Sequence, residues 1–278
     1  FWSVGLAEKY EVKNSWFYNL QLDIARKLVF KKWQEALGGN IVVIVSGGAA
    51  LNPRLARIFW AAGMPVFEGY GLTETSPVIT VNHFDGNTMF GTVGPAIEGM
   101  EIKIAEDGEV LARGHAIMKG YYNRPDLTAE TIDQDGWFHT GDIGEIIDGK
   151  FLKITDRKKE MFKTAGGKYV APQILENKFK ETILVEQVMV CGENRKFPVA
   201  LIVPNFNALR AWAEKKGMAY STDQEMIKDP QVLDKFERIV EESCKDFGKW
   251  EQVKRFALLP KIWTIEGGEL TPKLSFRR

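Results

Sequence analysis

The first 50 residues carry two hydrophobic patterns, one typical of a helix and one typical of a strand. Between Ser15 and Leu37 apolar residues recur every four positions, as one face of a helix requires; they are Trp16, Leu20, Ile24 and Leu28. The glycines at 38 and 39 would end that helix. The next segment, Ile41 to Val45, is a continuous β-branched run, and it predicts a buried parallel strand.

A small-residue turn and a second helix follow this strand. The turn covers residues 46–50 and reads SGGAA. Asn52 as N-cap and Pro53 at the first helical position predict a helix that ends at Gly63, and another apolar run follows it. Strand, helix, strand is the βαβ order, so we expect residues 1–92 to form part of a doubly wound α/β sheet.

Short strands with glycine turns replace this pattern over residues 93–155. Residues 101–104 and 109–112 flank the turn Glu106-Asp107-Gly108, which is a strong hairpin signal. Asp126 to Thr131 predicts a short helix. We therefore expect a small β-barrel-like subdomain in this part of the chain.

Residues 156–278 predict a small α+β domain. Helices are expected from Pro172 to Phe179 and after the Asp229-Pro230 cap, and strands over 185–191, 199–203 and 256–259. The helix after Asp229 has an apolar face that consists of Leu233, Phe236, Val240 and Cys244 or Phe247.

Composition narrows the class of protein. The 278 residues suffice for about two domains. Lys+Arg and Asp+Glu both number 37, so the net charge gives no support for a nucleic-acid partner or for attraction to a membrane. A peripheral contact with a membrane remains an alternative. Cys191 and Cys244 lie far apart, and neither they nor the three histidines have metal-ligand spacing, which favours a reducing, cytoplasmic location without a zinc site. The sequence predicts no oligomeric state.

The segment Val66 to Pro77, VFEGYGLTETSP, joins a strand end to a polar loop. Two glycines flank Tyr70, and glycine lets another molecule approach the main chain closely. The carboxyl edge of an α/β sheet is where such folds bind ligands. Tyr70 offers a flat ring, Thr73 a hydroxyl and Glu74 an oxygen ligand for a cation such as Mg²⁺. These groups fit a purine, a phosphate and its metal; a polar loop that closes an ordinary strand is the alternative.

YGLTE followed by TSP resembles a core motif of the AMP-forming acyl-CoA synthetases, members of the adenylate-forming superfamily that also contains luciferases and peptide-synthetase adenylation domains. The resemblance extends over nearly the whole chain. It implies that Tyr70 stacks on adenine, that Thr73 contacts the α-phosphate and that Glu74 holds Mg²⁺. Further nucleotide contacts are implied for Gly48, Ala49, Glu68, Gly69 and Gly71. For the SGGAA turn, a helix-capping role remains the alternative.

Two later segments resemble the ribose and hinge motifs of the family. The first reads GWFHTGD and ends at Asp142, whose carboxylate would accept both ribose hydroxyls. The second, ITDRKKE at residues 154–160, implies that Arg157 reaches the ribose or phosphate. It also implies that Lys159 is the pivot about which the C-terminal domain swings.

Two resemblances in the C-terminal domain keep an alternative. Gly166 and Gly167 lie in a loop similar to the one that lines the pantetheine channel, and both could equally be ordinary turn residues. Aligning the terminal arginine pair places Ser275 where many family members have the adenylation lysine, with Lys273 two residues earlier. Alternate strand positions point the same way, so Lys273 is the candidate for that role; a plain surface charge is the alternative.

The resemblance implies ATP-dependent activation of a carboxylic acid to an acyl-adenylate, followed by thioester formation with CoA, with Mg²⁺ as the metal. The stretches TETSPVITVN and GENRKFPVALIVPNF look most like the long-chain fatty-acid ligases, so the expected substrates are a fatty acid, ATP and CoA. An enzyme that adenylates another carboxylic acid and a non-catalytic nucleotide-binding module are the alternatives.

One family motif is missing from the sequence. The chain has no glycine-, serine- and threonine-rich phosphate loop ending in lysine, and no GxxxxGK[ST] stretch. It also opens on Phe1 rather than methionine. We therefore expect a fragment of the enzyme, its C-terminal half, that is inactive alone.

Overall fold

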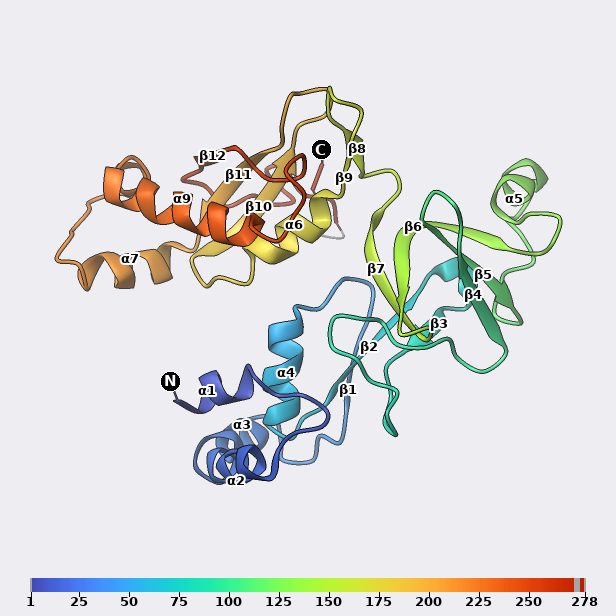
Figure 1. The fold of residues 1–278 in the computed structure, drawn as a ribbon, viewed down its shortest axis with the longest axis horizontal. Coiled ribbons are helices and arrows are strands. Elements are labelled where there is room, and N and C mark those ends of the chain that lie inside the picture. Colours follow the sequence, from blue (N-terminus) through green and yellow to red (C-terminus); the bar gives the residue numbers. More distant parts are fainter. Residues whose placement is uncertain (1, 273–275, 278) are drawn as a thin grey trace. The chain divides into compact units, whose positions relative to one another are not determined.

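The structure, a computed structural model, describes residues 2–272, 276 and 277. It divides into two compact units, Phe1–Thr155 and Asp156–Arg278 (Figure 1). Within the described residues, four sheets and several helices make a mixed α/β fold, which confirms the predicted fold class. The finer division into 1–92, 93–155 and 156–278 stays a prediction. Within the described residues, no helix is long and apolar enough to cross a membrane.

The first unit holds the elements up to β7. Its helical segments are α1 (Trp2–Ala7), α2 (Trp16–Ala25), the π-helical turn η1 (Arg26–Phe30), α3 (Lys31–Ala36), α4 (Pro53–Ala61), the 3₁₀ turn η2 (Thr73–Thr75) and α5 (Pro125–Thr131). Its strands are β1 (Ile44–Ser46), β2 (Val66–Gly71), β3 (Val78–Val81), β4 (Met100–Ile104), β5 (Glu109–Gly114), β6 (Phe138–Ile147) and β7 (Phe151–Arg157).

The predicted βαβ order is present in the sheet β1-β2-β3. Strands β1 and β2 are parallel, and α4 connects them. The Asn52 side chain accepts a hydrogen bond from the Arg54 N–H at 2.9 Å, and Pro53 occupies the first turn, so the helix begins as its sequence predicts. Strand β3 then pairs with β2 in the antiparallel direction.

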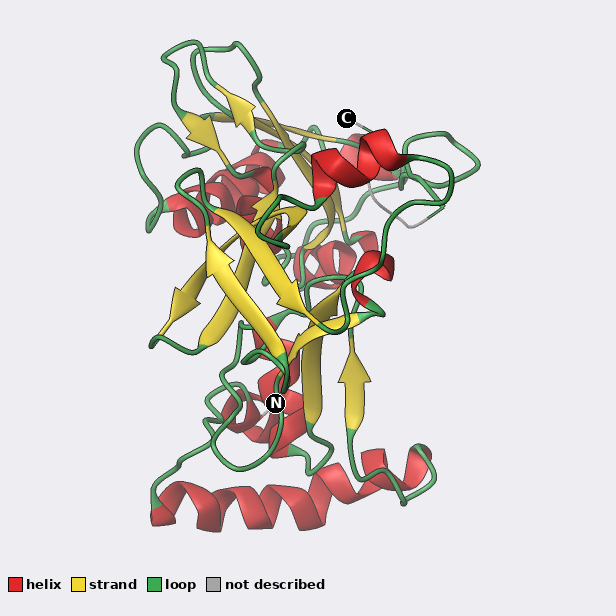
Figure 2. Cartoon of the chain, turned by 90° about the vertical axis from the view of Figure 1, so that its right-hand side faces the viewer, coloured by secondary structure: helices red, strands yellow, loops and turns green. Residues whose placement is uncertain are grey.

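The apolar row of the first long helix is exposed. Figure 2 shows α2, η1 and α3 as one helical stretch at the bottom of the view. Leu22, Ala25 and Phe30 are its buried residues, whereas Trp16 is 77% exposed, and Leu20, Ile24 and Leu28 are exposed as well. The four-residue spacing therefore identifies a shared face correctly but not the face that packs onto the unit.

The prediction of a buried parallel strand over Ile41 to Val45 is correct in its parallel pairing but wrong in its bounds and its burial. Strand β1 is shorter, Ile44–Ser46, and it pairs with β2 on one side. Val42 is 76% exposed and Val45 is 70% exposed. A β-branched run predicts a strand from its residue types, but its burial depends on neighbouring elements that the described residues do not supply.

The second sheet of this unit has the order β4-β5-β6-β7 and corresponds to the β-rich region that the sequence predicts. Main-chain hydrogen bonds join β7 to the segment after β3: the Val93 N–H donates to the Leu152 carbonyl at 2.8 Å, and the Leu152 N–H donates to the Gly94 carbonyl at 2.9 Å. A Cβ at Gly94 would lie 2.1 Å from the Val81 carbonyl carbon, so this junction requires glycine.

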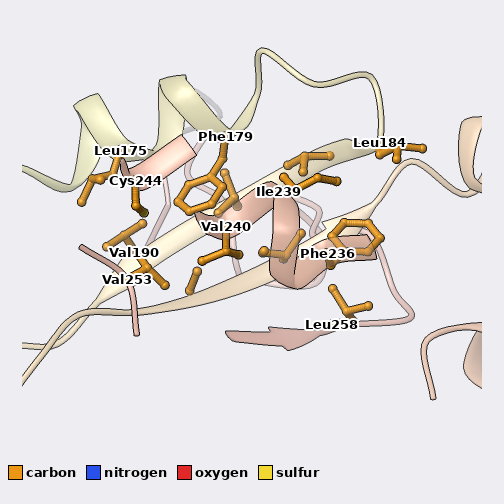
Figure 3. Packing of buried hydrophobic residues seen from close by; sticks show 14 of the residues in the cluster. Leu175, Phe179, Leu184, Val190, Phe236, Ile239, Val240, Cys244, Val253 and Leu258 are labelled. Carbon is orange, nitrogen blue, oxygen red and sulfur yellow. The ribbon is translucent and has the colours of Figure 1, made fainter. Parts of the chain in front are cut away.

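The second unit packs helices onto the sheet β10-β11-β12. Its strands are β8 (Phe162–Lys163), β9 (Tyr169–Val170), β10 (Val185–Cys191), β11 (Val199–Pro204) and β12 (Arg255–Leu258). Its helices are α6 (Pro172–Phe179), α7 (Phe206–Glu214), α8 (Asp223–Met226) and α9 (Pro230–Cys244). Figure 3 shows Phe179, Phe236 and Val240 within one apolar core between these helices and strands.

The predicted apolar face of α9 is correct except at its first residue. Phe236, Val240 and Cys244 are buried, but Leu233 is 39% exposed and Val232 is the fully buried residue of that turn. The helix starts where the sequence predicts, because the Asp229 side chain accepts a hydrogen bond from the Gln231 N–H at 2.7 Å.

We expect Phe236→Ala to lower the free energy of unfolding of the second unit by about 3–5 kcal/mol, because it leaves a cavity in a closed core. The matched control on the same helix is Leu233→Ala, whose effect should stay below about 1 kcal/mol. Urea unfolding followed by tryptophan fluorescence measures both. Equal losses for the two variants would contradict the packing described here.

Candidate functional site

The end of β2 is shaped by a close contact between two main-chain segments. A Cβ at Gly71 would lie 1.6 Å from the Pro77 carbonyl oxygen, so no side chain fits at this position. At Gly69 a Cβ would lie 3.3 Å from the Thr80 carbonyl oxygen, which is a tight contact. The two glycines let β2 and β3 approach each other on both sides of Tyr70, and they therefore fix where the Tyr70 ring emerges.

Tyr70 and Asp142 meet across the first unit. The Tyr70 hydroxyl donates a hydrogen bond to Asp142 Oδ2 at 2.6 Å, although the residues are 72 positions apart. Asp142 is buried and Tyr70 is partly buried. The bond fixes the tilt of the aromatic ring and the orientation of the carboxylate together. The structure thus brings two of the predicted site residues into direct contact.

Asp142 lies in a bulge of β6. Glu109 pairs with Ile143 and Leu111 pairs with His139, so residues 140–142 of β6 lie opposite the single residue Val110 of β5. Gly141 has φ +72°, a value that favours glycine. Bulges of this kind re-aim side chains next to functional sites. The Thr-Gly-Asp sequence therefore predicts a local geometry as well as a carboxylate.

Two side chains hold this bulge. The Thr140 hydroxyl donates to the Val110 carbonyl at 2.7 Å and accepts from the Asp142 N–H at 3.2 Å. The buried carboxylate of Glu109 accepts from the Gly141 N–H at 2.9 Å, and its other oxygen lies 3.1 Å from His139 Nδ1. The main chain on both sides of Asp142 is thereby tied to β5.

Glu68 connects the SGGAA turn to β2. Its carboxylate is buried and accepts a hydrogen bond from the Leu51 N–H at 3.1 Å. A Cβ at Gly47 would lie 3.4 Å from the Gly69 carbonyl oxygen, so the two strand ends lie side by side. Gly48 and Ala49 are exposed at the tip of this turn. The turn is thus held next to the Tyr70 loop within the same unit.

Glu74 follows Tyr70 on the turn η2. Its carboxylate is partly exposed, and Oε1 accepts a hydrogen bond from the Tyr121 hydroxyl at 3.0 Å. Thr73, at the start of the turn, is exposed. Among the described residues, no group of three or more His, Cys, Asp or Glu side chains could hold a metal ion. One carboxylate fits Mg²⁺ that arrives with phosphate oxygens as its other ligands, rather than a metal held by protein alone.

The predicted site residues of the second unit are exposed. Arg157 is the last residue of β7, Lys159 follows it, and Gly166 and Gly167 lie in the turn between β8 and β9. Gly167 has φ +75°, and its N–H donates to the Thr164 carbonyl at 2.9 Å, as in an ordinary tight turn.

The last predicted residue is not tested by the structure. Lys273 lies outside the described residues, as does Ser275.

Two family profiles match the chain. The profile of the AMP-binding enzyme matches residues 12–122, and the profile of the AMP-binding enzyme C-terminal domain matches residues 160–278. The chain belongs to the AMP-binding enzyme family. Both profiles belong to one family and follow each other in order, so the resemblance of the sequence motifs is confirmed.

Curated relatives of this chain are named long-chain-fatty-acid–CoA ligases. FadD15 from Mycobacterium bovis is 38% identical over 253 residues, which are 91% of this chain and 42% of the relative. Human long-chain-fatty-acid–CoA ligase 1 is 36% identical over 267 residues, with 91% of this chain and 38% of the relative covered. The chain thus spans about two fifths of the length of these relatives.

Solved structures share the fold of the AMP-binding enzyme. The adenylation domain of a carboxylate reductase from Mycobacterium chelonae covers 99% of this chain and is itself covered to 41%, with a TM-score of 0.67 and 23% identity. O-succinylbenzoate coenzyme A synthetase from Bacillus subtilis, solved with ATP and a magnesium ion, covers 84% of this chain and is covered to 47%, with a TM-score of 0.59 and 23% identity.

Sequence reasoning missed several residues that hold this site. Glu109 and Tyr121 carry no motif of their own, since a lone acid or tyrosine in a β-rich region looks like a surface residue. His139 lies in the GWFHTGD segment, but the spacing of the histidines gives it no role there. Asp156 was included only as part of the charged hinge, yet it is buried and accepts hydrogen bonds from the Arg157 N–H at 2.6 Å and the Gln173 N–H at 3.1 Å. It thus satisfies a main-chain donor in the first turn of α6.

Burial raises the pKa of Glu68 to about 7, although the hydrogen bond from the Leu51 N–H lowers it. The folded chain therefore keeps a proton on Glu68 at pH values where the unfolded chain has lost it. The stability from this group is fully present below about pH 4.5, the ordinary glutamate value, and is lost as pH rises to about 7.

We expect Glu68→Gln to remove this part of the pH dependence. Between pH 4 and pH 8 the wild-type chain should lose about 3 kcal/mol more stability than the variant, since about 2.5 pKa units separate the two states. Glutamine still offers an oxygen to the Leu51 N–H. Urea unfolding at both pH values measures the difference, with the exposed Glu106→Gln as the control. Parallel pH profiles for wild type and Glu68→Gln would contradict it.

Proposed function

We propose that this chain carries the adenosine-binding part of an AMP-forming ligase that activates a long-chain fatty acid and transfers it to CoA. The observation that carries the proposal is the hydrogen bond between Tyr70 and Asp142, because it joins the two motifs assigned to adenine and ribose. Further support comes from the names of the relatives, which are long-chain-fatty-acid–CoA ligases at 36–38% identity.

The proposed reaction has two steps. In the first, an oxygen of the fatty-acid carboxylate forms a bond to the α-phosphorus of ATP, and the bond to pyrophosphate breaks. In the second, the CoA thiol loses its proton and attacks the acyl carbon, and AMP leaves. Neither step needs a covalent intermediate on the protein, so the chain contributes orientation and charge stabilisation.

Each residue then has a defined task. The Tyr70 ring, fixed through its hydroxyl, offers a flat face to adenine. Asp142 accepts from the ribose hydroxyls, because an ionised carboxylate can accept several hydrogen bonds at once. Thr73 contacts the α-phosphate, and Glu74 accepts the Mg²⁺ that accompanies the phosphates.

The other predicted residues complete the proposal. Gly48 and Ala49 border the adenine, together with Glu68, which holds their turn in place. Arg157 reaches the ribose or phosphate, and Lys159 serves as the pivot of the second unit. Gly166 and Gly167 line the path of the CoA pantetheine, and Lys273 is the adenylation lysine.

We expect Asp142→Ala to weaken AMP binding by the chain. A lost charge-assisted hydrogen bond costs about 1.5–3 kcal/mol, which lowers affinity about 10- to 100-fold. Titration calorimetry with AMP measures the change. The matched control is Glu145→Ala, which removes an exposed acid three positions further along the same strand. Unchanged affinity in Asp142→Ala would overturn the assignment of the ribose contact.

We expect no acyl-CoA from this chain with palmitate, ATP and CoA, because its sequence has no phosphate loop. Thioester formation by the purified 278 residues would contradict that expectation. In the polypeptide that the complete gene encodes, we expect ATP–pyrophosphate exchange to depend on palmitate. Exchange that depends instead on an aromatic acid or an amino acid would overturn the assignment of the substrate.

A further inference from the structure

One short segment holds both the main chain and the side chain of Glu74. The Met118 N–H donates to the Glu74 carbonyl at 2.8 Å, and the Tyr121 hydroxyl donates to Glu74 Oε1 at 3.0 Å. These contacts come from the loop between β5 and α5, more than 40 positions away in the sequence. The turn η2 is therefore supported from outside its own β2–β3 connection.

The position of Tyr121 is itself fixed. Its N–H donates to the Thr128 hydroxyl at 2.9 Å, and that hydroxyl donates to the Arg124 carbonyl at 3.0 Å at the start of α5. Gly120 has φ +148°, and a Cβ there would lie 2.8 Å from Thr128 Cγ2. Only glycine lets the loop approach α5 this closely, so the Tyr121 ring starts from a defined backbone.

We propose that Tyr121 is the positioning residue that holds the Glu74 carboxylate ready for the Mg²⁺ of the bound nucleotide. The inference rests on the proposed function, because it assumes that Glu74 accepts this metal. The phenol donates to one carboxylate oxygen and leaves the other available. Residues that orient a metal-binding carboxylate contribute strongly to metal affinity, and their substitution typically costs about 10- to 100-fold.

Holding the Glu74 side chain in place also lowers the entropic cost of binding a metal. A glutamate side chain on a turn loses rotamer freedom when it binds a metal. A hydrogen bond that already restricts the side chain before binding reduces this entropic cost.

The neighbouring tyrosine provides the contrast. Tyr122 is 92% exposed. The sequence GYYN does not distinguish the two rings, but the fold directs Tyr121 to Glu74 and Tyr122 to solvent. Tyr122→Phe is therefore a matched control that makes the same chemical change one position away.

The test compares wild type, Tyr121→Phe and Tyr122→Phe by calorimetric titration with ATP across a series of Mg²⁺ concentrations, and with AMP in the absence of metal. We expect Tyr121→Phe to raise the Mg²⁺ concentration for half-maximal ATP binding about tenfold or more. AMP affinity without metal should stay within about twofold of wild type. Tyr122→Phe should match wild type in both titrations.

A purely structural role would give a different result. If Tyr121→Phe weakens AMP and ATP equally at every Mg²⁺ concentration, the positioning role is overturned. If wild type depends on Mg²⁺ and Tyr121→Phe shows the same dependence, the inference fails while the proposed function stands. If wild-type ATP binding is independent of Mg²⁺, Glu74 does not hold the metal. That result would overturn both the positioning role of Tyr121 and the metal-binding role of Glu74 in the proposed function.

If Tyr121→Phe lowers the stability of the chain, a double-mutant cycle with Glu74 still tests the positioning role. Glu74→Gln removes the metal ligand but keeps an acceptor for the phenol. If Tyr121 acts through Glu74, adding Tyr121→Phe to Glu74→Gln should leave the remaining Mg²⁺ dependence unchanged. A further loss of the same size as in the single variant would overturn the proposal.

Discussion

The contact between the Tyr70 hydroxyl and the Asp142 carboxylate is the interaction on which the site depends. It joins the sheet β1-β2-β3 to the sheet β4-β5-β6-β7 within the first unit at 2.6 Å. A buried carboxylate needs hydrogen-bond donors to remain charged, and Tyr70 supplies one of them. The ring of one motif and the acid of the other are therefore oriented by each other rather than by separate parts of the fold.

Two groups expected to touch a ligand, Asp142 and Glu74, are also held by residues that are not expected to touch it. Glu109 and Thr140 hold the main chain at Asp142, and Tyr121 holds Glu74. Such support is how rigid sites keep their geometry before a ligand arrives. The supporting residues come from elements distant in sequence, so a change in any of them would alter the site without touching its motif.

The sequence predicts the motifs and the local elements well, because both depend on residues close together along the chain. Asn52 and Asp229 begin their helices as expected, and the Thr-Gly-Asp segment lies in a bulge of β6 that brings Asp142 to Tyr70. Burial is less predictable, since it depends on what packs against an element. The exposed Trp16 row and Val45 show this, as does the support of Glu74 by Tyr121, whose partner no local pattern reveals.

Gly71 has a consequence for how distant relatives are recognised. Because the Pro77 carbonyl oxygen fills the space that any side chain would need, the glycine is a steric requirement of this loop and not a preference of its backbone. A related sequence that keeps the tyrosine and the glutamate of the motif but has alanine or serine at the position of Gly71 would need a different path of the main chain between β2 and β3. We expect the loop of such a sequence to have a different conformation, even where its other residues match this motif.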